Sequence, residues 1–80
     1  MKVYSIFDRV TSQYGVPFFA VNNVDAMRRC KAAYSGNPYL DDLQLFSLGE
    51  FNSDSGFFVS DKPLFLSNIS ELFEVNNNAE

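Results

Sequence analysis

The sequence predicts a small α+β domain: an antiparallel sheet of about four strands, packed against one main helix and a short C-terminal helix. Short runs rich in β-branched and aromatic residues are separated by turn signals, and a single stretch carries a complete set of helix signals. The chain has 80 residues, which suits one domain. We therefore expect a single domain over residues 1–75 and a frayed acidic tail over residues 76–80.

The first strand is expected over residues 2–8, a segment too short and too lacking in helical period to form a helix. Its apolar side chains fall on both faces. Val3 and Phe7 share one face, and Tyr4 and Ile6 share the other. Such a strand is either covered on both sides or leaves one aromatic face for a partner.

A polar loop is expected over residues 8–14, followed by a second strand over residues 15–21. Pro17 has no backbone N–H to donate, so it suits the start of this strand or a sheet edge. We expect the first two strands to pair in antiparallel fashion.

The main helix is expected over residues 23–35. Asn22 is a suitable N-cap, Asp25 lies in the first turn where the helix dipole favours an anion, and Gly36 supplies the left-handed stop. Apolar residues recur at spacings of three and four and form one stripe, made of Ala26, Met27, Cys30, Ala33 and Tyr34. That stripe is expected to pack on the sheet, and the remaining face is cationic.

The third strand is expected over residues 43–51, with a bulge at Gly49. A strong turn over residues 52–56 then leads to a fourth strand over residues 57–60. These two strands should form a hairpin.

After the hairpin, residues 61–63 are expected to form another turn, because they end in Pro63, and residues 64–66 form a short apolar piece. Residues 67–75 are expected to form a short helix capped by Ser67 or Asn68. This helix should dock on the sheet.

The composition argues against an enzyme. There is no histidine and one cysteine, which removes the commonest general base, the usual nucleophile pairs and a thiolate metal site. No pair of carboxylates is held at a working separation, and the scattered glycines form no phosphate-binding loop. We expect no catalytic residue, no metal and no cofactor. Without a signal peptide or an apolar membrane span, the chain is expected to be soluble in a reducing cytoplasm.

Charge is divided unevenly along the chain. Residues 1–36 hold five basic and two acidic residues, whereas residues 37–80 hold one basic and eight acidic residues. Three of the cations lie on the helix and two lie at the ends of the first strand: Arg28, Arg29, Lys31, Lys2 and Arg9. The simplest interpretation of the helix cations is a solvated surface.

Two other interpretations of these cations stay open. Cations beside aromatic side chains such as Tyr14, Phe19 and Tyr34 are typical of proteins that bind single-stranded nucleic acid. Alternatively, the cationic face of one copy meets the acidic half of another in a head-to-tail or two-fold assembly.

Three segments together resemble a known family. They are residues 1–8, the Pro17-Phe18-Phe19 that leads into a helix with Ala26-Met27-Arg28-Arg29, and residues 45–52 followed by Gly56. In order and spacing they resemble the small nonstructural protein of gokushoviruses, which are microviruses with small circular single-stranded DNA genomes. The resemblance covers roughly residues 1–58 and leaves the acidic C-terminal part unmatched.

The resemblance implies a nonstructural phage protein in the bacterial host cytoplasm, absent from the virion and often described as DNA-binding. It also implies a role in replication, in the switch from double-stranded templates to single-strand synthesis for packaging. The family has no established catalytic residues that could be assigned to positions of this sequence. We expect any DNA contact at the five cations named above, with single-stranded DNA and a viral or host replication protein as candidate partners.

The alternative is an acidic protein-interaction module that engages a viral or host protein without contacting DNA. In either case we expect a homodimer, because apolar residues occupy both faces of the central strands and only two helices are available to cover them.

Overall fold

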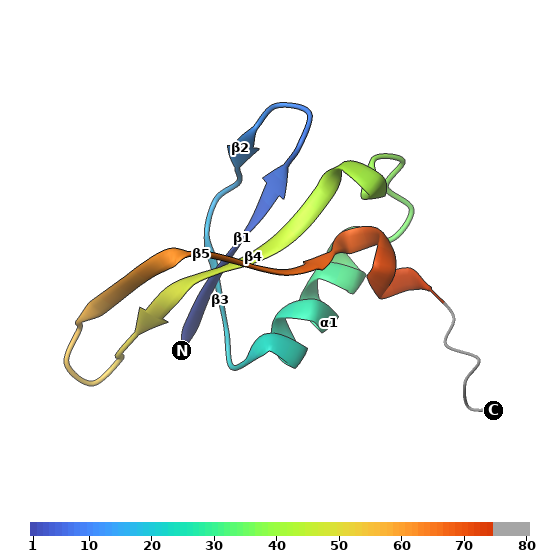
Figure 1. Ribbon diagram of the computed structural model, residues 1–80. Coiled ribbons are helices and arrows are strands. Elements are labelled where there is room, and N and C mark those ends of the chain that lie inside the picture. Colours follow the sequence, from blue (N-terminus) through green and yellow to red (C-terminus); the bar gives the residue numbers. More distant parts are fainter. Residues whose placement is uncertain (75–80) are drawn as a thin grey trace.

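The computed structural model describes residues 1–74 and confirms the predicted α+β class, with one antiparallel sheet, a main helix and a short C-terminal helix (Figure 1). The sheet has five strands rather than about four. The elements are β1 Lys2–Asp8, β2 Gln13–Tyr14, β3 Phe18–Ala20, α1 Asn23–Ala33, the 3-10 helix η1 Leu40–Asp42, β4 Leu43–Phe51, β5 Phe58–Asn68 and the 3-10 helix η2 Ile69–Phe73. The tail predicted over residues 76–80 lies outside the described residues.

The strand β1 is the centre of the sheet. β4 pairs along one side of it, while β2 and β3 pair with successive parts of the other side, all antiparallel. The predicted first and third strands are confirmed, but the predicted second strand over residues 15–21 is only three residues long. The loop expected over residues 8–14 ends in β2. Because Pro17 has no N–H to donate, the pairing with β1 is interrupted there, and the returning chain forms two short strands, β2 and β3.

The predicted bulge in β4 is confirmed at Gly49. The β4–β5 pairing changes register between Ser47 and Gly49, and Gly49 has a φ of +151°. A Cβ atom on this residue would overlap the backbone carbonyl of Val59. Glycine is therefore required here by both the backbone conformation and the close approach of β5.

The turn predicted over residues 61–63 is wrong, because β5 continues through it as one edge strand of 11 residues. Ser60 is opposite Gly49 and Leu64 is opposite Ser47, so residues 61–63 bulge outward between two paired stretches. Pro63 is accommodated because an edge strand does not need every N–H. Pairing with β4 thus overrides the local turn signals.

The helix α1 forms as predicted, although it ends at Ala33 rather than at residue 35. The side-chain Oδ1 of Asn22 accepts a hydrogen bond from the backbone N–H of Asp25 at 2.9 Å, which confirms the predicted N-cap. Gly36 is left-handed, with a φ of +80°. The helix predicted over residues 67–75 is the shorter η2.

The hydrophobic core lies between one face of the sheet and the helices. Tyr4, Ile6 and Leu45 of the sheet are buried against Ala26 and Cys30 of α1. Ile69 of η2 completes the cluster, and Leu40 of η1 packs at its margin. All three helices of residues 1–74 therefore pack on the same side of the sheet.

Candidate nucleic-acid interface

The sheet has a second face, turned away from the helices, which we call the open face. Side chains alternate along a strand, so Val3, Ser5 and Phe7 of β1 point to the open face while Tyr4 and Ile6 point to the core. Residues paired across neighbouring strands share a face. The register therefore extends the open face over all five strands.

Four aromatic rings from β1, β2, β4 and β5 meet at one end of the open face. The ring centroids of Phe7 and Tyr14 are 4.8 Å apart, and those of Tyr14 and Phe46 are 5.4 Å apart. Phe46 also lies 5.9 Å from Phe7 and 5.8 Å from Phe65. Most of these contacts are tilted or edge-to-face, the arrangements that aromatic pairs prefer.

Three further rings continue the open face toward the start of β1. Phe51 lies between Phe19, at 5.7 Å, and Phe58, at 6.2 Å between ring centroids. Several rings of the two groups keep about half of their surface in solvent: Tyr14 is 44% exposed, Phe19 45%, Phe58 54% and Phe65 46%. The open face is thus a broad aromatic surface that no helix of residues 1–74 covers.

The residues between the rings are neutral. Gln44 lies opposite Phe7, and its Nε2 donates a hydrogen bond to Oδ1 of Asn68 at 3.2 Å. Ser5 is fully buried and donates its hydroxyl hydrogen bond to the carbonyl of Gly15 at 2.7 Å. None of the cross-strand pairs described on the open face contains a charged residue.

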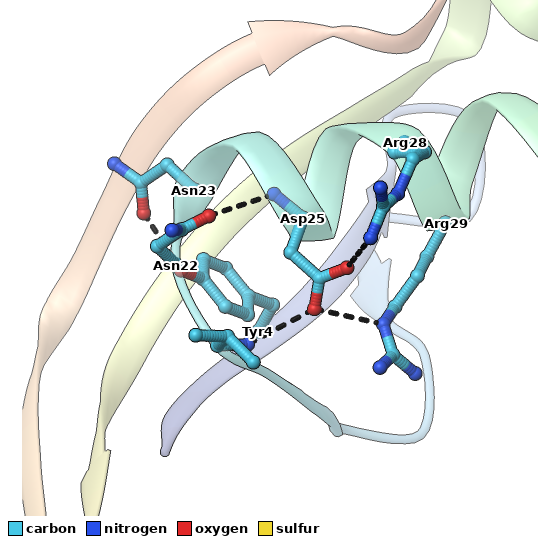
Figure 2. Close-up of polar contacts among 7 residues, drawn as sticks. Tyr4, Asn22, Asn23, Asp25, Arg28 and Arg29 are labelled. Atoms are coloured by element: carbon cyan, nitrogen blue, oxygen red, sulfur yellow. Dashed lines mark hydrogen bonds and ion pairs between the residues drawn. The ribbon is translucent and has the colours of Figure 1, made fainter.

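Two of the three cations of α1, Arg28 and Arg29, bind Asp25 in the first turn of the helix (Figure 2), whereas Lys31 lies in the last turn. Arg28 donates through Nη2 to Oδ1 of Asp25 at 2.9 Å, and Arg29 donates through Nε to Oδ2 at 3.1 Å. The same Oδ2 accepts a hydrogen bond from the backbone N–H of Val21 at 3.0 Å. The Val21 amide, followed by the Arg28 guanidinium, lowers the pKa of Asp25 to about 2. Two arginines therefore share one carboxylate.

A buried tyrosine ties this helix end to β1. The hydroxyl of Tyr4 donates to Oδ1 of Asn23 at 2.7 Å (Figure 2), and the tyrosine side chain is fully buried. Burial, and secondarily the negative charge of Asp25, raises the pKa of Tyr4. The link fixes where α1 begins relative to the sheet.

The five predicted cations do not form one cluster. Arg28, Arg29 and Lys31 are exposed on α1. Lys2 and Arg9 lie at opposite ends of β1, separated by roughly 20 Å at the rise of an extended strand. The backbone N–H of Arg9 donates to the carbonyl of Asp42 at 2.9 Å, which holds the chain at that end.

Two of the three aromatic residues expected beside the helix cations lie apart from them, because Tyr14 and Phe19 are on the open face, opposite the side on which α1 packs. Tyr34 packs against the core and lines one pocket together with Arg29. Sequence reasoning missed the ring groups centred on Phe46 and Phe51. The signal that could have found them is the strict pairing of open-face positions between β1, β4 and β5, which needs the register.

The described residues offer little for covalent or metal chemistry. Cys30 is buried on the core side of α1, and burial raises the pKa of its thiol to about 11. The reactive thiolate is therefore scarce at neutral pH. Within residues 1–74 there is no group of acidic and cysteine side chains able to hold a metal ion. In the same part of the chain, no helix has the length and apolar character to cross a membrane.

The chain matches a known protein family. A family model described as Phage ORF5 protein matches residues 1–72, which include every strand and helix described above except the last residue of η2. Comparisons with curated proteins and with solved structures gave no match.

Proposed function

Since the chain belongs to the Phage ORF5 protein family, we propose that it is a non-enzymatic phage protein that binds single-stranded DNA through its open face. The observation that carries this proposal is the aromatic surface of the open face, whose rings come from all five strands and are about half exposed on β2, β3 and β5. We further propose that it acts in the host cytoplasm, in viral genome replication or the switch to packaging, as a nonstructural protein of the gokushovirus type.

The chemistry of the open face suits unpaired bases. A base offers a flat π surface that stacks on an aromatic side chain, with a gain of about 1–3 kcal/mol per base. In a duplex these surfaces are already stacked on each other, so an aromatic sheet discriminates in favour of single strands. The neutral amides of Gln44 and Asn68 offer hydrogen bonds to base edges between the rings.

Phosphate contacts are expected at the margins of the open face. Arg9 follows β1 next to the group that contains Phe7 and Tyr14, and Lys62 lies on the edge strand near Phe65. Both are exposed. Only a few phosphates would be neutralised, and the protein carries a net charge of −4, so we expect modest affinity that weakens as salt rises.

The test is fluorescence anisotropy with a labelled oligothymidine of about 30 nucleotides, at about 50 and 150 mM NaCl. Phe65→Ala and Tyr14→Ala should each weaken binding by about tenfold, the loss of one stacked base. Tyr39→Ala is the matched control, because Tyr39 is 66% exposed and lies outside the open face. Duplex of the same length should compete poorly.

Protein binding is the second candidate function, because the rings are surrounded by neutral residues and the whole chain is acidic. Such a surface also suits an apolar patch on a viral or host replication protein. If the oligonucleotide fails to bind even at low salt, or if Phe65→Ala binds as well as wild type, the DNA proposal is wrong and the protein-interaction function replaces it.

A further inference from the structure

The far end of the β4–β5 hairpin projects beyond the helices (Figure 1). We call residues 50–61 the arm. Its turn is well ordered, because Oδ1 of Asn52 accepts hydrogen bonds from the backbone N–H groups of Asp54 and Ser55, at 2.9 and 3.1 Å. The Asn52 N–H also donates to the carbonyl of Phe57 at 2.9 Å. These hydrogen bonds close the turn at the tip of the arm.

The arm is both apolar and acidic. Phe57 is 73% exposed and Val59 is 59% exposed. Glu50, Asp54 and Asp61 are also exposed on it. Within residues 1–74 both ion pairs use Asp25, so these three carboxylates form no ion pair there, although Lys2 lies opposite Glu50 across β1 and β4.

A complementary surface lies at the beginning of α1, which we call the helix patch. It is a hollow of about 410 Å³ lined by Val21, Asn22, Val24, Asp25, Arg28 and Arg29. Its apolar part is unusually open to solvent, with Val21 64% and Val24 75% exposed. Its cationic part is accessible too, since the side chains of Arg28 and Arg29 are 81% and 55% exposed.

The two arginines keep hydrogen-bonding capacity after pairing with Asp25. Arg28 uses Nη2 and Arg29 uses Nε for that carboxylate, and a guanidinium has five N–H donors. The remaining donors of both side chains are able to bind a second carboxylate. The helix patch therefore combines apolar contact area with unused donors for an anion, which matches the arm.

We propose that two copies of this chain associate about a two-fold axis, with the arm of each copy seated on the helix patch of the other. Both surfaces lie at the end of the sheet where β1 begins: Glu50 pairs with Lys2, and Asn23 bonds Tyr4. One two-fold axis near this end brings each arm to the opposite helix patch, and the assembly closes as a dimer. The contact uses the side of the arm that carries Glu50, Phe57 and Val59, and the open-face rings of the arm, Phe51 and Phe58, take no part in it.

The arrangement gives the α1 cations a role separate from DNA. Opposite charges on the two surfaces favour the reciprocal contact and disfavour arm-to-arm or patch-to-patch association. The apolar residues, Phe57 and Val59 on one side and Val21 and Val24 on the other, supply the burial that charge alone does not provide.

The test is sedimentation velocity of the complete chain without DNA. A patch-reversed variant carries Arg28→Glu and Arg29→Glu, and an arm-reversed variant carries Glu50→Arg and Asp61→Arg. Wild type should sediment as a dimer. Each variant alone should sediment as a monomer, because its dimer dissociation constant is at least tenfold higher than that of wild type. Mixed together the two variants should dimerise again, because both contacts of the mixed pair then join opposite charges.

Circular dichroism of each variant checks that it folds, and Val24→Glu provides a second patch variant that leaves the arginines and Asp25 in place. A monomeric wild type at low salt would overturn the proposal. So would a dimer that survives both charge reversals, or reversed variants that fail to dimerise when mixed. A dimer lost in Phe65→Ala would instead identify the open face as the interface. None of these outcomes depends on DNA binding.

Discussion

The two faces of the sheet differ in how completely their side chains are buried, and neighbouring residues of β4 show it. Leu45 points to the core and is fully buried, whereas Phe46 points to the open face and is partly exposed among other rings. The core face joins sheet and helices into one unit. The open face keeps large apolar rings in water, which folding alone does not require. The difference supports our proposal that the open face is a binding surface, whereas the core face holds the fold together.

The two faces should lose very different amounts of stability when one side chain on each is shortened to alanine. Leu45→Ala should lower the free energy of unfolding by about 2–4 kcal/mol, since it leaves a cavity in the core. Phe65→Ala should lower it by about 1 kcal/mol or less, because Phe65 is already 46% exposed. Urea unfolding followed by circular dichroism measures both. Equal losses would mean that the open face is a second structural core.

A smaller effect is expected from Tyr4→Phe, which removes only the hydroxyl that bonds Asn23. The lost hydrogen bond should lower the free energy of unfolding by about 1 kcal/mol and leave oligonucleotide binding unchanged. Tyr14→Phe is the matched change on the open face. If Tyr4→Phe is as stable as wild type, the bond to Asn23 does not secure the helix.

A pH-dependent effect is expected on the helix side. The pKa of Asp25 is lowered in the folded protein to about 2, from an ordinary value of 3.8. A lowered pKa stabilises the folded state at pH values above the ordinary pKa, and that stabilisation is lost as the pH falls toward the folded value. The excess stability of wild type over Asp25→Asn should therefore be larger at about pH 6 than at about pH 2.5. A pH-independent difference would contradict the ion-pair geometry.

Much of the fold follows from local signals in the sequence. The Asn22 cap, the acidic first turn and the left-handed Gly36 are properties of short segments, so α1 was predictable almost to its ends. The course of β5 was not. Residues 61–63 are of types that favour a turn. The strand continues past them because Ser60 pairs with Gly49 and Leu64 pairs with Ser47.

The candidate site was harder to predict than the fold. Helical periodicity shows that Arg28 and Arg29 share a surface, but it does not show which side of the sheet the helix covers. That choice separates them from Tyr14 and Phe19. The heavy aromatic content was visible in the sequence, and an uncovered aromatic face was one of the two arrangements that the pattern of β1 allowed. Its extent depends on strand register, which no single segment encodes.

The interrupted course of β5 has a consequence for the protein at high concentration. An edge strand with a regular row of free N–H and C=O groups is a template on which further chains add, and growth of this kind ends in fibres. In β5 the outward bulge at residues 61–63 breaks that row, and Pro63 removes one donor from it. An edge of this shape lets the chain reach a high concentration without polymerising through its sheet.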